Sequence, residues 1–85
     1  MRIPIDPHSE VPLYQQIEAY LRQSILSGTL AADTRLPASR ALSQELGVSR
    51  VTVENAYAIL EADGLLARRS GSGSYVLPPG ADLPA

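Results

Sequence analysis

The three residues from Gly47 to Ser49 restrict the fold of this chain more than any other feature, because they fit a sharp turn between two helices. Gly47 supplies the left-handed conformation that often ends a helix, and Val48 can pack back on that helix. Ser49 is a favourable N-cap residue for a second helix. Two helices joined by a short turn that contains glycine form a helix-turn-helix, so the sequence predicts this arrangement around Gly47.

The helix after this turn has one apolar face. Its residues follow the i, i+3, i+4, i+7 spacing of a helix packed on a core: Val53, Ala56, Tyr57 and Leu60. With this face buried, three residues lie on the opposite side: Val51, Asn55 and Ala58. Arg50 and Glu54 then lie on one flank of the outer face, and Thr52 lies on the other. We therefore expect the first turn of this helix to present several side chains to solvent.

Two further helices are expected before the turn. The first begins after Pro12 and ends near Gly28. Its apolar residues form one helical face: Leu13, Ile17, Tyr20, Leu21 and Ile25. The second follows Pro37 and carries Leu42 and Leu46 four residues apart. Ser39 is its better capping candidate, since alanine occupies position 38 and cannot cap. The connector over residues 29–37 ends in Thr-Arg-Leu, which fits a very short strand.

The C-terminal part predicts a small β-hairpin. Residues 65–69 and 74–77 fit two short strands, and the sequence SGSGS at 70–74 joins them. Such a composition alone is typical of a flexible linker. The apolar residues on both sides favour a hairpin. The expected fold is therefore mostly α with a small β-hairpin wing, a three-helix winged helix-turn-helix over residues 12–77, with an irregular N-terminal arm at 1–11 and a linker or tail at 78–85.

The charges are unevenly distributed. The 85-residue chain has a formal net charge of -2, which by itself argues against a nucleic-acid binder. All seven basic side chains are arginine, however. Five of these lie between residues 35 and 69: Arg35, Arg40, Arg50, Arg68 and Arg69. If they converge in space, the acidic average hides a local basic face.

Several classes of function lack the residues that they require. There is no cysteine, and His8 is the only histidine, so no cluster of metal ligands is expected. No constellation of titratable side chains suggests catalysis. No apolar run reaches membrane-spanning length, and the N-terminus does not resemble a secretory signal. A cytoplasmic protein that is not an enzyme and binds no metal is the expectation.

Two features of the predicted surface have competing interpretations. Arg50 could simply pair with Glu54 one helical turn away. It could equally reach a base edge or phosphate from the front of a recognition helix, the element that enters the major groove. An exposed Val51 suits contact with a thymine methyl group, although single exposed valines are common. A glycine-rich hairpin flanked by Arg68 and Arg69 can lie close to phosphates or enter a minor groove.

The order and spacing of short motifs resembles a known family. These motifs are LP-x-x-R, LGVSR-x-TV, AY-x-x-L, DG-L and GSGSYV. Together they resemble the N-terminal winged helix-turn-helix domain of GntR-type bacterial transcription regulators. The short sequences SRAL and AY are most similar to those of the MocR/PdxR subfamily. The resemblance implies sequence-specific binding of double-stranded DNA, with the recognition helix in the major groove and the wing on the minor groove or backbone.

The resemblance also implies roles for matching residues. DNA contacts are expected from the two helices of the motif: Arg40, Ser49, Arg50 and Thr52. The wing tip is expected at Ser70, Gly71 and Gly73, where glycine permits positive backbone dihedrals. Arg35, Arg68 and Arg69 are candidate phosphate contacts. The chain departs from the family pattern at Ala38 and Ala41, which replace a capping box, and at the acidic Glu54. Glu54 could orient Arg50 or accept from a cytosine amino group.

Proteins of the resembled subfamily carry a C-terminal domain that binds pyridoxal phosphate. This implies that the chain is an excised DNA-binding domain or a naturally short relative, with no cofactor of its own. The isolated domain is then expected to be a monomer or weak dimer, and its parent a homodimer. The rival interpretation is a winged helix used for protein–protein contact. A DNA-binding face should gather the arginines, whereas a protein-binding face should expose apolar area.

Overall fold

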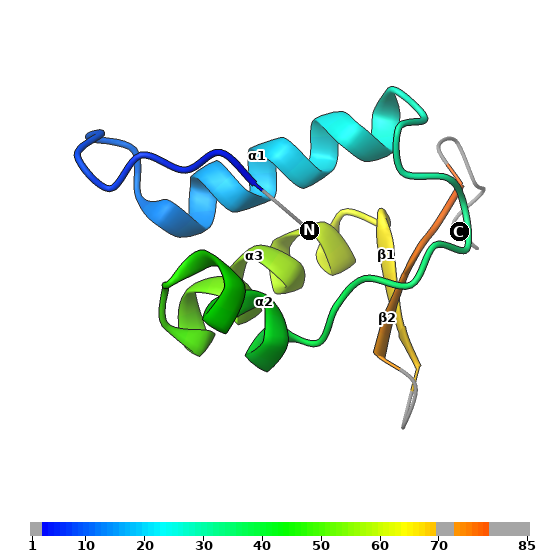
Figure 1. The fold of residues 1–85 in the computed structure, drawn as a ribbon. Helices are drawn as coiled ribbons and strands as arrows, with labels where there is room; N and C mark the ends of the chain where they lie inside the picture. Colours follow the sequence, from blue (N-terminus) through cyan, green and yellow to red (C-terminus); the bar gives the residue numbers. More distant parts are fainter. Residues whose placement is uncertain (1–2, 70–72, 79–85) are drawn as a thin grey trace.

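The computed structural model describes residues 3–69 and 73–78. The described residues form three helices followed by two antiparallel strands: α1 (Leu13–Leu26), α2 (Ser39–Leu46), α3 (Arg50–Ala62), β1 (Leu66–Arg69) and β2 (Gly73–Val76). Figure 1 shows this order, with the hairpin at one end of the helical layer. The predicted winged helix-turn-helix fold is confirmed, and each strand differs from its predicted bounds by one residue at one or both ends.

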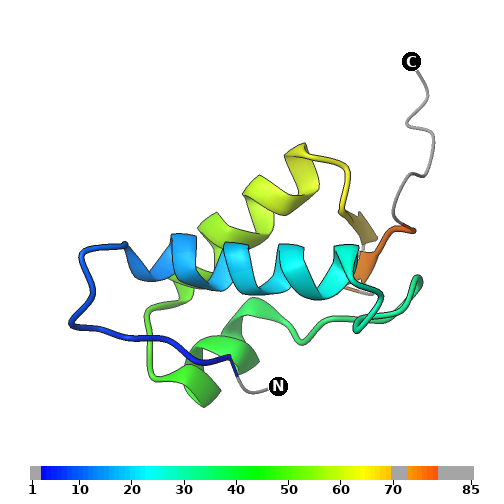
Figure 2. The same ribbon diagram turned by 90° about the horizontal axis from the view of Figure 1, so that it is seen from above.

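The core lies between α1, α3 and the hairpin. α1 crosses over α3, as Figure 2 shows from above. α1 buries Ile17, Leu21 and Ile25 completely. The apolar face predicted for α3 is also buried: Val53, Ala56, Tyr57 and Leu60. Leu42 of α2, Leu66 of β1 and Val76 of β2 complete the same cluster, together with Leu36 and Ile3.

The predicted face of α1 is wrong at one residue. Tyr20 is 38% exposed, whereas Ser24 is buried and its hydroxyl donates to the backbone carbonyl of Tyr20 at 2.9 Å. The contact surface of α1 is centred on Ile17, Leu21 and Ile25, so Tyr20 falls at its rim and Ser24 falls inside it. The burial of this serine leaves no unpaired polar group, because its hydroxyl is satisfied within the helix.

The connector before α2 pairs with the hairpin. Arg35 forms an isolated antiparallel bridge with Tyr75 of β2. The backbone N–H of Leu36 donates to the carbonyl of Ser74, and that of Val76 donates to the carbonyl of Thr34, each at 2.9 Å. The expected short strand is thus confirmed as a single bridge. It places Arg35 beside the wing, with its Nε 3.5 Å from the point where a Cβ at Gly73 would lie.

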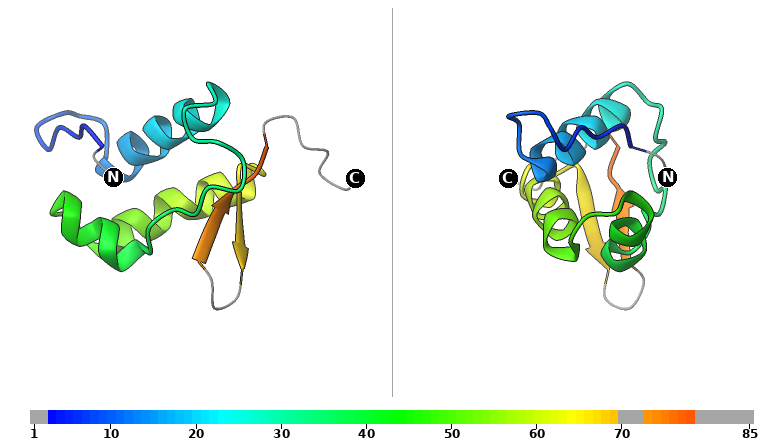
Figure 3. Two further views of the ribbon diagram at one scale, coloured as in Figure 1. Left: turned by 45° about the vertical axis from the view of Figure 1, so that its right-hand side comes forward. Right: turned by 60° about the vertical axis from the view of Figure 1, so that its left-hand side comes forward.

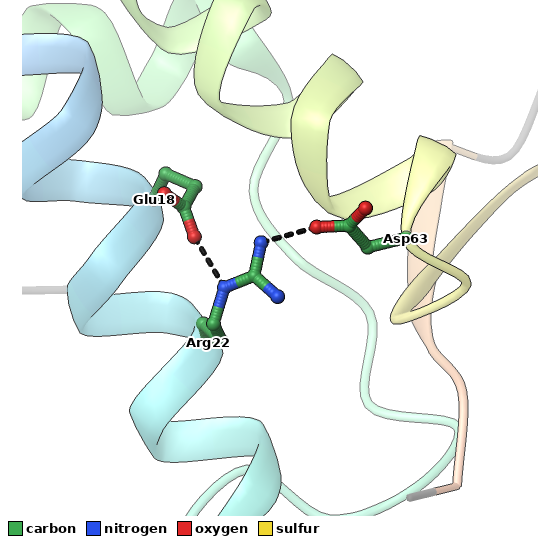
Figure 4. Close-up of polar contacts among 3 residues, drawn as sticks. All are labelled: Glu18, Arg22 and Asp63. Carbon is green, nitrogen blue, oxygen red and sulfur yellow. Dashed lines mark hydrogen bonds and ion pairs between the residues drawn. The ribbon is translucent and has the colours of Figure 1, made fainter. Parts of the chain in front are cut away.

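Ion pairs join α1 to the end of α3. Arg22 of α1 donates to the carboxylates of Glu18, one turn earlier, and of Asp63, which caps α3 (Figure 4). The hydrogen bond with Asp63, and to a smaller extent the one with Glu18, raises the pKa of the Arg22 guanidinium above its ordinary value. Arg22 therefore serves the packing of α1 against α3, at the point where the chain turns from α3 into the hairpin.

The start of α2 differs from the prediction. Ser39 is not its N-cap: the cap is Ala38, which makes no side-chain hydrogen bond, and Ser39 is the first helical residue. Because the helix already includes Ser39, its hydroxyl is directed to α3, where it donates to the carboxylate of Glu54 at 3.4 Å. A second link comes from the core, since the Tyr57 hydroxyl donates to the carbonyl of Pro37 at 2.7 Å. α2 therefore begins on contacts with α3 and not on a local cap.

Candidate nucleic-acid interface

The turn between α2 and α3 has the predicted geometry. Gly47 adopts the left-handed conformation, with φ 71° and ψ 32°, and Val48 packs against the core. The Ser49 side chain accepts a hydrogen bond from the backbone N–H of Thr52 at 3.2 Å, and the two hydroxyl oxygens lie 2.7 Å apart. Ser49 is thus the N-cap of α3, as the sequence predicts. The turn fixes the direction in which the first residues of α3 leave the domain.

The first turn of α3 presents its side chains to solvent. The Arg50 side chain is 63% exposed, and Val51 is 61% exposed. Asn55 and Ala58, further along the same outer face, are exposed as well, whereas Thr52 is half-buried on its flank. The helical phasing predicted this division correctly. An arginine and an apolar side chain therefore stand next to each other at the end of α3 that a recognition helix directs to base edges.

Glu54 connects this surface to α2. Its Oε2 lies 3.3 Å from the Nε of Arg50 and 3.4 Å from the hydroxyl of Ser39. The contact with Arg50 is the i, i+4 pair that the sequence left as one of two interpretations. The contact with Ser39 could not be anticipated, because it depends on the angle between two helices.

The wing carries arginines on both of its faces. The strand register places Arg68 opposite Ser74, whereas Arg35 lies opposite Tyr75, the next residue. Since neighbouring residues of a strand point to opposite faces, Arg35 and Arg68 point away from each other. Arg68 faces α3, where its Nε lies 3.6 Å from a carboxylate oxygen of Glu61. The arginines that the sequence grouped together therefore do not all gather on one face.

The remaining predicted site residues occupy the rest of this surface. Arg40 is exposed on α2. Within residues 3–69 and 73–78, no acidic side chain forms an ion pair with Arg35 or Arg40. Gly73 has φ 93°, which confirms the expected positive dihedral. The side chain of Arg69 and the whole of Ser70 and Gly71 lie outside the described residues. Figure 3 shows the two strands projecting beyond the helices on the side away from α1.

Two other kinds of site can be assessed in the same part of the chain. Among the described residues, no group of three histidine or acidic side chains could hold a metal ion. No helix in the described residues has the length and apolar character needed to cross a lipid bilayer.

Three features together define a winged helix-turn-helix of the DNA-binding class. They are a capped helix with an exposed arginine at its first turn, a preceding helix joined to it by a sharp glycine turn, and a projecting hairpin. The model of the family described as "Bacterial regulatory proteins, gntR family" matches residues 13–76. The chain therefore belongs to the gntR family of bacterial regulatory proteins.

Two regulators illustrate the similarity at the level of sequence. The chain is 49% identical over 79 residues to the probable rhizopine catabolism regulatory protein MocR of Rhizobium meliloti, a match that covers 91% of this chain and 16% of MocR. It is 37% identical over 76 residues to the pyridoxine biosynthesis transcriptional regulator PdxR of Corynebacterium glutamicum, with 89% of this chain and 17% of PdxR covered. The chain thus spans less than a fifth of the length of either relative.

Solved structures support the same assignment. YtrA from Sulfolobus acidocaldarius, a GntR-family transcription factor, superposes with a TM-score of 0.81 at 33% identity, covering 88% of this chain and 79% of YtrA. The DNA-binding domain of AraR in complex with operator ORX1 superposes with a TM-score of 0.73, also at 33% identity, covering 86% of this chain and 90% of that domain. The chain is a GntR-type DNA-binding domain of transcription regulators, and the rival protein–protein interpretation is not supported.

Proposed function

We propose that this domain binds a specific sequence of double-stranded DNA, with α3 in the major groove and the wing against the minor groove or the backbone. The observation that carries the proposal is the exposure of Arg50 and Val51 at the capped end of α3. Arginine makes bidentate hydrogen bonds to guanine O6 and N7, and valine can pack on a thymine methyl group. These two neighbours would read adjacent positions of one operator half-site.

The other candidate residues are assigned to orientation on the backbone. Arg40 on α2 and the hydroxyls of Ser49 and Thr52 would contact phosphates beside the major groove, where hydrogen bonds fix the register of α3. Ser70, Gly71 and Gly73 would form the wing tip that approaches the backbone or minor groove. Arg35, Arg68 and Arg69 would add phosphate contacts along the wing. Arg68 should make the weakest of these phosphate contacts, because the carboxylate of Glu61, 3.6 Å from its Nε, already neutralises part of its charge.

The whole regulator is proposed from the relatives. Regulators similar to MocR and PdxR are several times longer than this chain, and we propose that a C-terminal domain binds pyridoxal phosphate and forms a homodimer. This chain lacks lysine, so none of its side chains can form the Schiff base that holds this cofactor in enzymes. The residues present therefore do not fit the cofactor. The proposed role of the domain itself is binding without catalysis, in the bacterial cytoplasm, where the chromosome lies.

An electrophoretic mobility shift with DNA from the promoter region of the regulator's own gene tests the proposal. The purified chain should retard this fragment in the presence of a random-sequence competitor, and Arg50→Ala should weaken the preference. Equal retardation of the promoter fragment and a fragment of scrambled sequence would contradict sequence-specific binding.

A further inference from the structure

Glu54 is the one acidic side chain in the described part of the chain that contacts the exposed arginine of α3. It lies on the same flank of the outer face as Arg50 and is itself 43% exposed at its side chain. A carboxylate at this place repels every DNA phosphate, so its presence lowers affinity for DNA of any sequence. A residue that weakens binding in general needs a compensating role if the domain is to bind one sequence tightly.

The contact geometry indicates what that role is. Glu54 receives Arg50 through Nε, at 3.3 Å. A guanidinium carries five N–H donors, and this contact leaves the two terminal nitrogens free of it. Those two nitrogens form the fork that a bidentate contact to guanine uses. An arginine held by its Nε loses less conformational freedom when it binds, because part of its side-chain ordering has already taken place.

The link to α2 restricts the carboxylate itself. The Ser39 hydroxyl donates to the same Oε2, and Ser39 is held at the start of α2 by the neighbouring Tyr57–Pro37 hydrogen bond. An Oε2 that accepts from Ser39 and is paired with the charge of Arg50 is poorly placed to turn to a cytosine amino group. Of the two roles that the sequence allowed for Glu54, the structure favours the orientation of Arg50.

We propose that Glu54 is a positioning residue that fixes the guanidinium of Arg50 and thereby raises the ratio of specific to non-specific DNA binding. The inference rests on the proposed function. Double-mutant cycles on exposed ion pairs give about 0.2–1 kcal/mol, which corresponds to a change of roughly 1.4- to 5-fold in an equilibrium constant. Loss of Glu54 should lower the ratio by a factor in this range, while affinity for random DNA rises because one negative charge is gone.

Glu61 offers a matched control. It also lies on α3 and pairs with an arginine, Arg68, at 3.6 Å. The side-chain exposures of this pair are 45% and 56%, close to the 43% and 63% of Glu54 and Arg50. Glu61→Ala removes the same charge from the same helix without touching the first turn. It should raise affinity for specific and random DNA by the same factor and leave their ratio unchanged.

The experiment measures dissociation constants by fluorescence anisotropy for a promoter-derived duplex and a random duplex. The proteins are the parent, Glu54→Ala, Glu54→Gln, Glu61→Ala, Arg50→Ala and the Arg50→Ala/Glu54→Ala double variant. Glutamine keeps an acceptor for Arg50, so Glu54→Gln should retain more of the ratio than Glu54→Ala. In the Arg50→Ala background the Glu54 substitution should have no further effect on the ratio.

Three results would overturn the inference. The first is an unchanged ratio in Glu54→Ala. The second is a loss that persists in the absence of Arg50, since this would mean that Glu54 contacts a base directly. The third is a parent that binds both duplexes equally. That result refutes the proposed function as well, and it is read from the parent alone, so the two failures are distinguishable.

Discussion

Replacement of Tyr57 by phenylalanine tests how the core of α3 holds the start of α2. Tyr57 is 2% exposed, and its hydroxyl donates to the carbonyl of Pro37 at 2.7 Å. A neutral hydrogen bond of this kind contributes about 0.5–1.5 kcal/mol to stability. We expect Tyr57→Phe to lower the free energy of unfolding by about 1 kcal/mol at pH 7, which lowers the Tm of a domain of this size by about 4–8 °C.

The same substitution should change the response to alkaline pH. Burial raises the pKa of Tyr57 above its ordinary value of 10.0, because desolvation disfavours the phenolate. Below pH 10 the phenol is protonated in both folded and unfolded chains and adds no pH dependence. Above pH 10 the unfolded chain releases a proton that the folded chain retains, so the parent loses stability as pH rises. The slope is about 1.4 kcal/mol per pH unit, which gives a loss of roughly 1.4 kcal/mol at pH 11.

Urea unfolding followed by circular dichroism between pH 7 and pH 11 measures both effects. Phenylalanine does not ionise, so the variant escapes the loss and the two stability curves should converge near pH 11. The window is favourable because the chain contains no lysine. The remaining tyrosines occur in both proteins and cancel in the difference. Parallel curves up to pH 11 would refute the burial of the phenol, and equal stability at pH 7 would refute the contribution of its hydrogen bond.

Four further results are expected. Arg50→Ala should weaken binding to the specific duplex by roughly 5- to 150-fold without loss of Tm, and equal affinity would remove its recognition role. The logarithm of the binding constant should fall with the logarithm of salt concentration at a slope of roughly -3 to -4 per domain, if about four arginines contact phosphates; a slope near zero would exclude this. Gly73→Ala should lower the free energy of unfolding by roughly 1–2 kcal/mol, because φ is 93° there and side chains disfavour this backbone conformation; unchanged urea unfolding would contradict the strain. Arg22→Ala should lower stability by roughly 0.4–2 kcal/mol through its two ion pairs while specific DNA affinity is retained, and a loss of affinity at unchanged Tm would contradict its structural role.

The parts of the fold that the sequence predicted well depend on local signals. Gly47 and Ser49 define the turn by their own backbone and side-chain preferences, and the structure confirms both. The buried face of α3 follows from helical periodicity, so the sequence alone assigns Val51 to the outer surface. Such inferences succeed because they need only the neighbours along the chain.

The parts that were missed depend on contacts between elements. Ser39 looked like a cap because serine often is one, but the angle between α2 and α3 gives its hydroxyl a partner on Glu54 instead. Tyr20 looked like a core residue, but it lies at the rim of the buried face of α1, and Ser24 is buried in its place. A buried tyrosine signals that its hydroxyl has a partner. The identity of that partner, Pro37, could not be read from the sequence.

The charge distribution explains how an acidic chain can bind a polyanion. Arg22, on the α1 side, is shared between two carboxylates, whereas Arg50 and Arg68 each contact one. The cations are therefore less neutralised toward α2, the first turn of α3 and the wing than toward α1. A domain with only the few phosphate contacts proposed above should bind random DNA weakly, and one copy should bind one half-site weakly too. Two copies joined in a dimer bind the second half-site at high effective concentration, so affinity for a two-site operator rises far more than affinity for single random sites. Low net charge and the proposed dimeric parent would thus act in the same direction, toward selectivity.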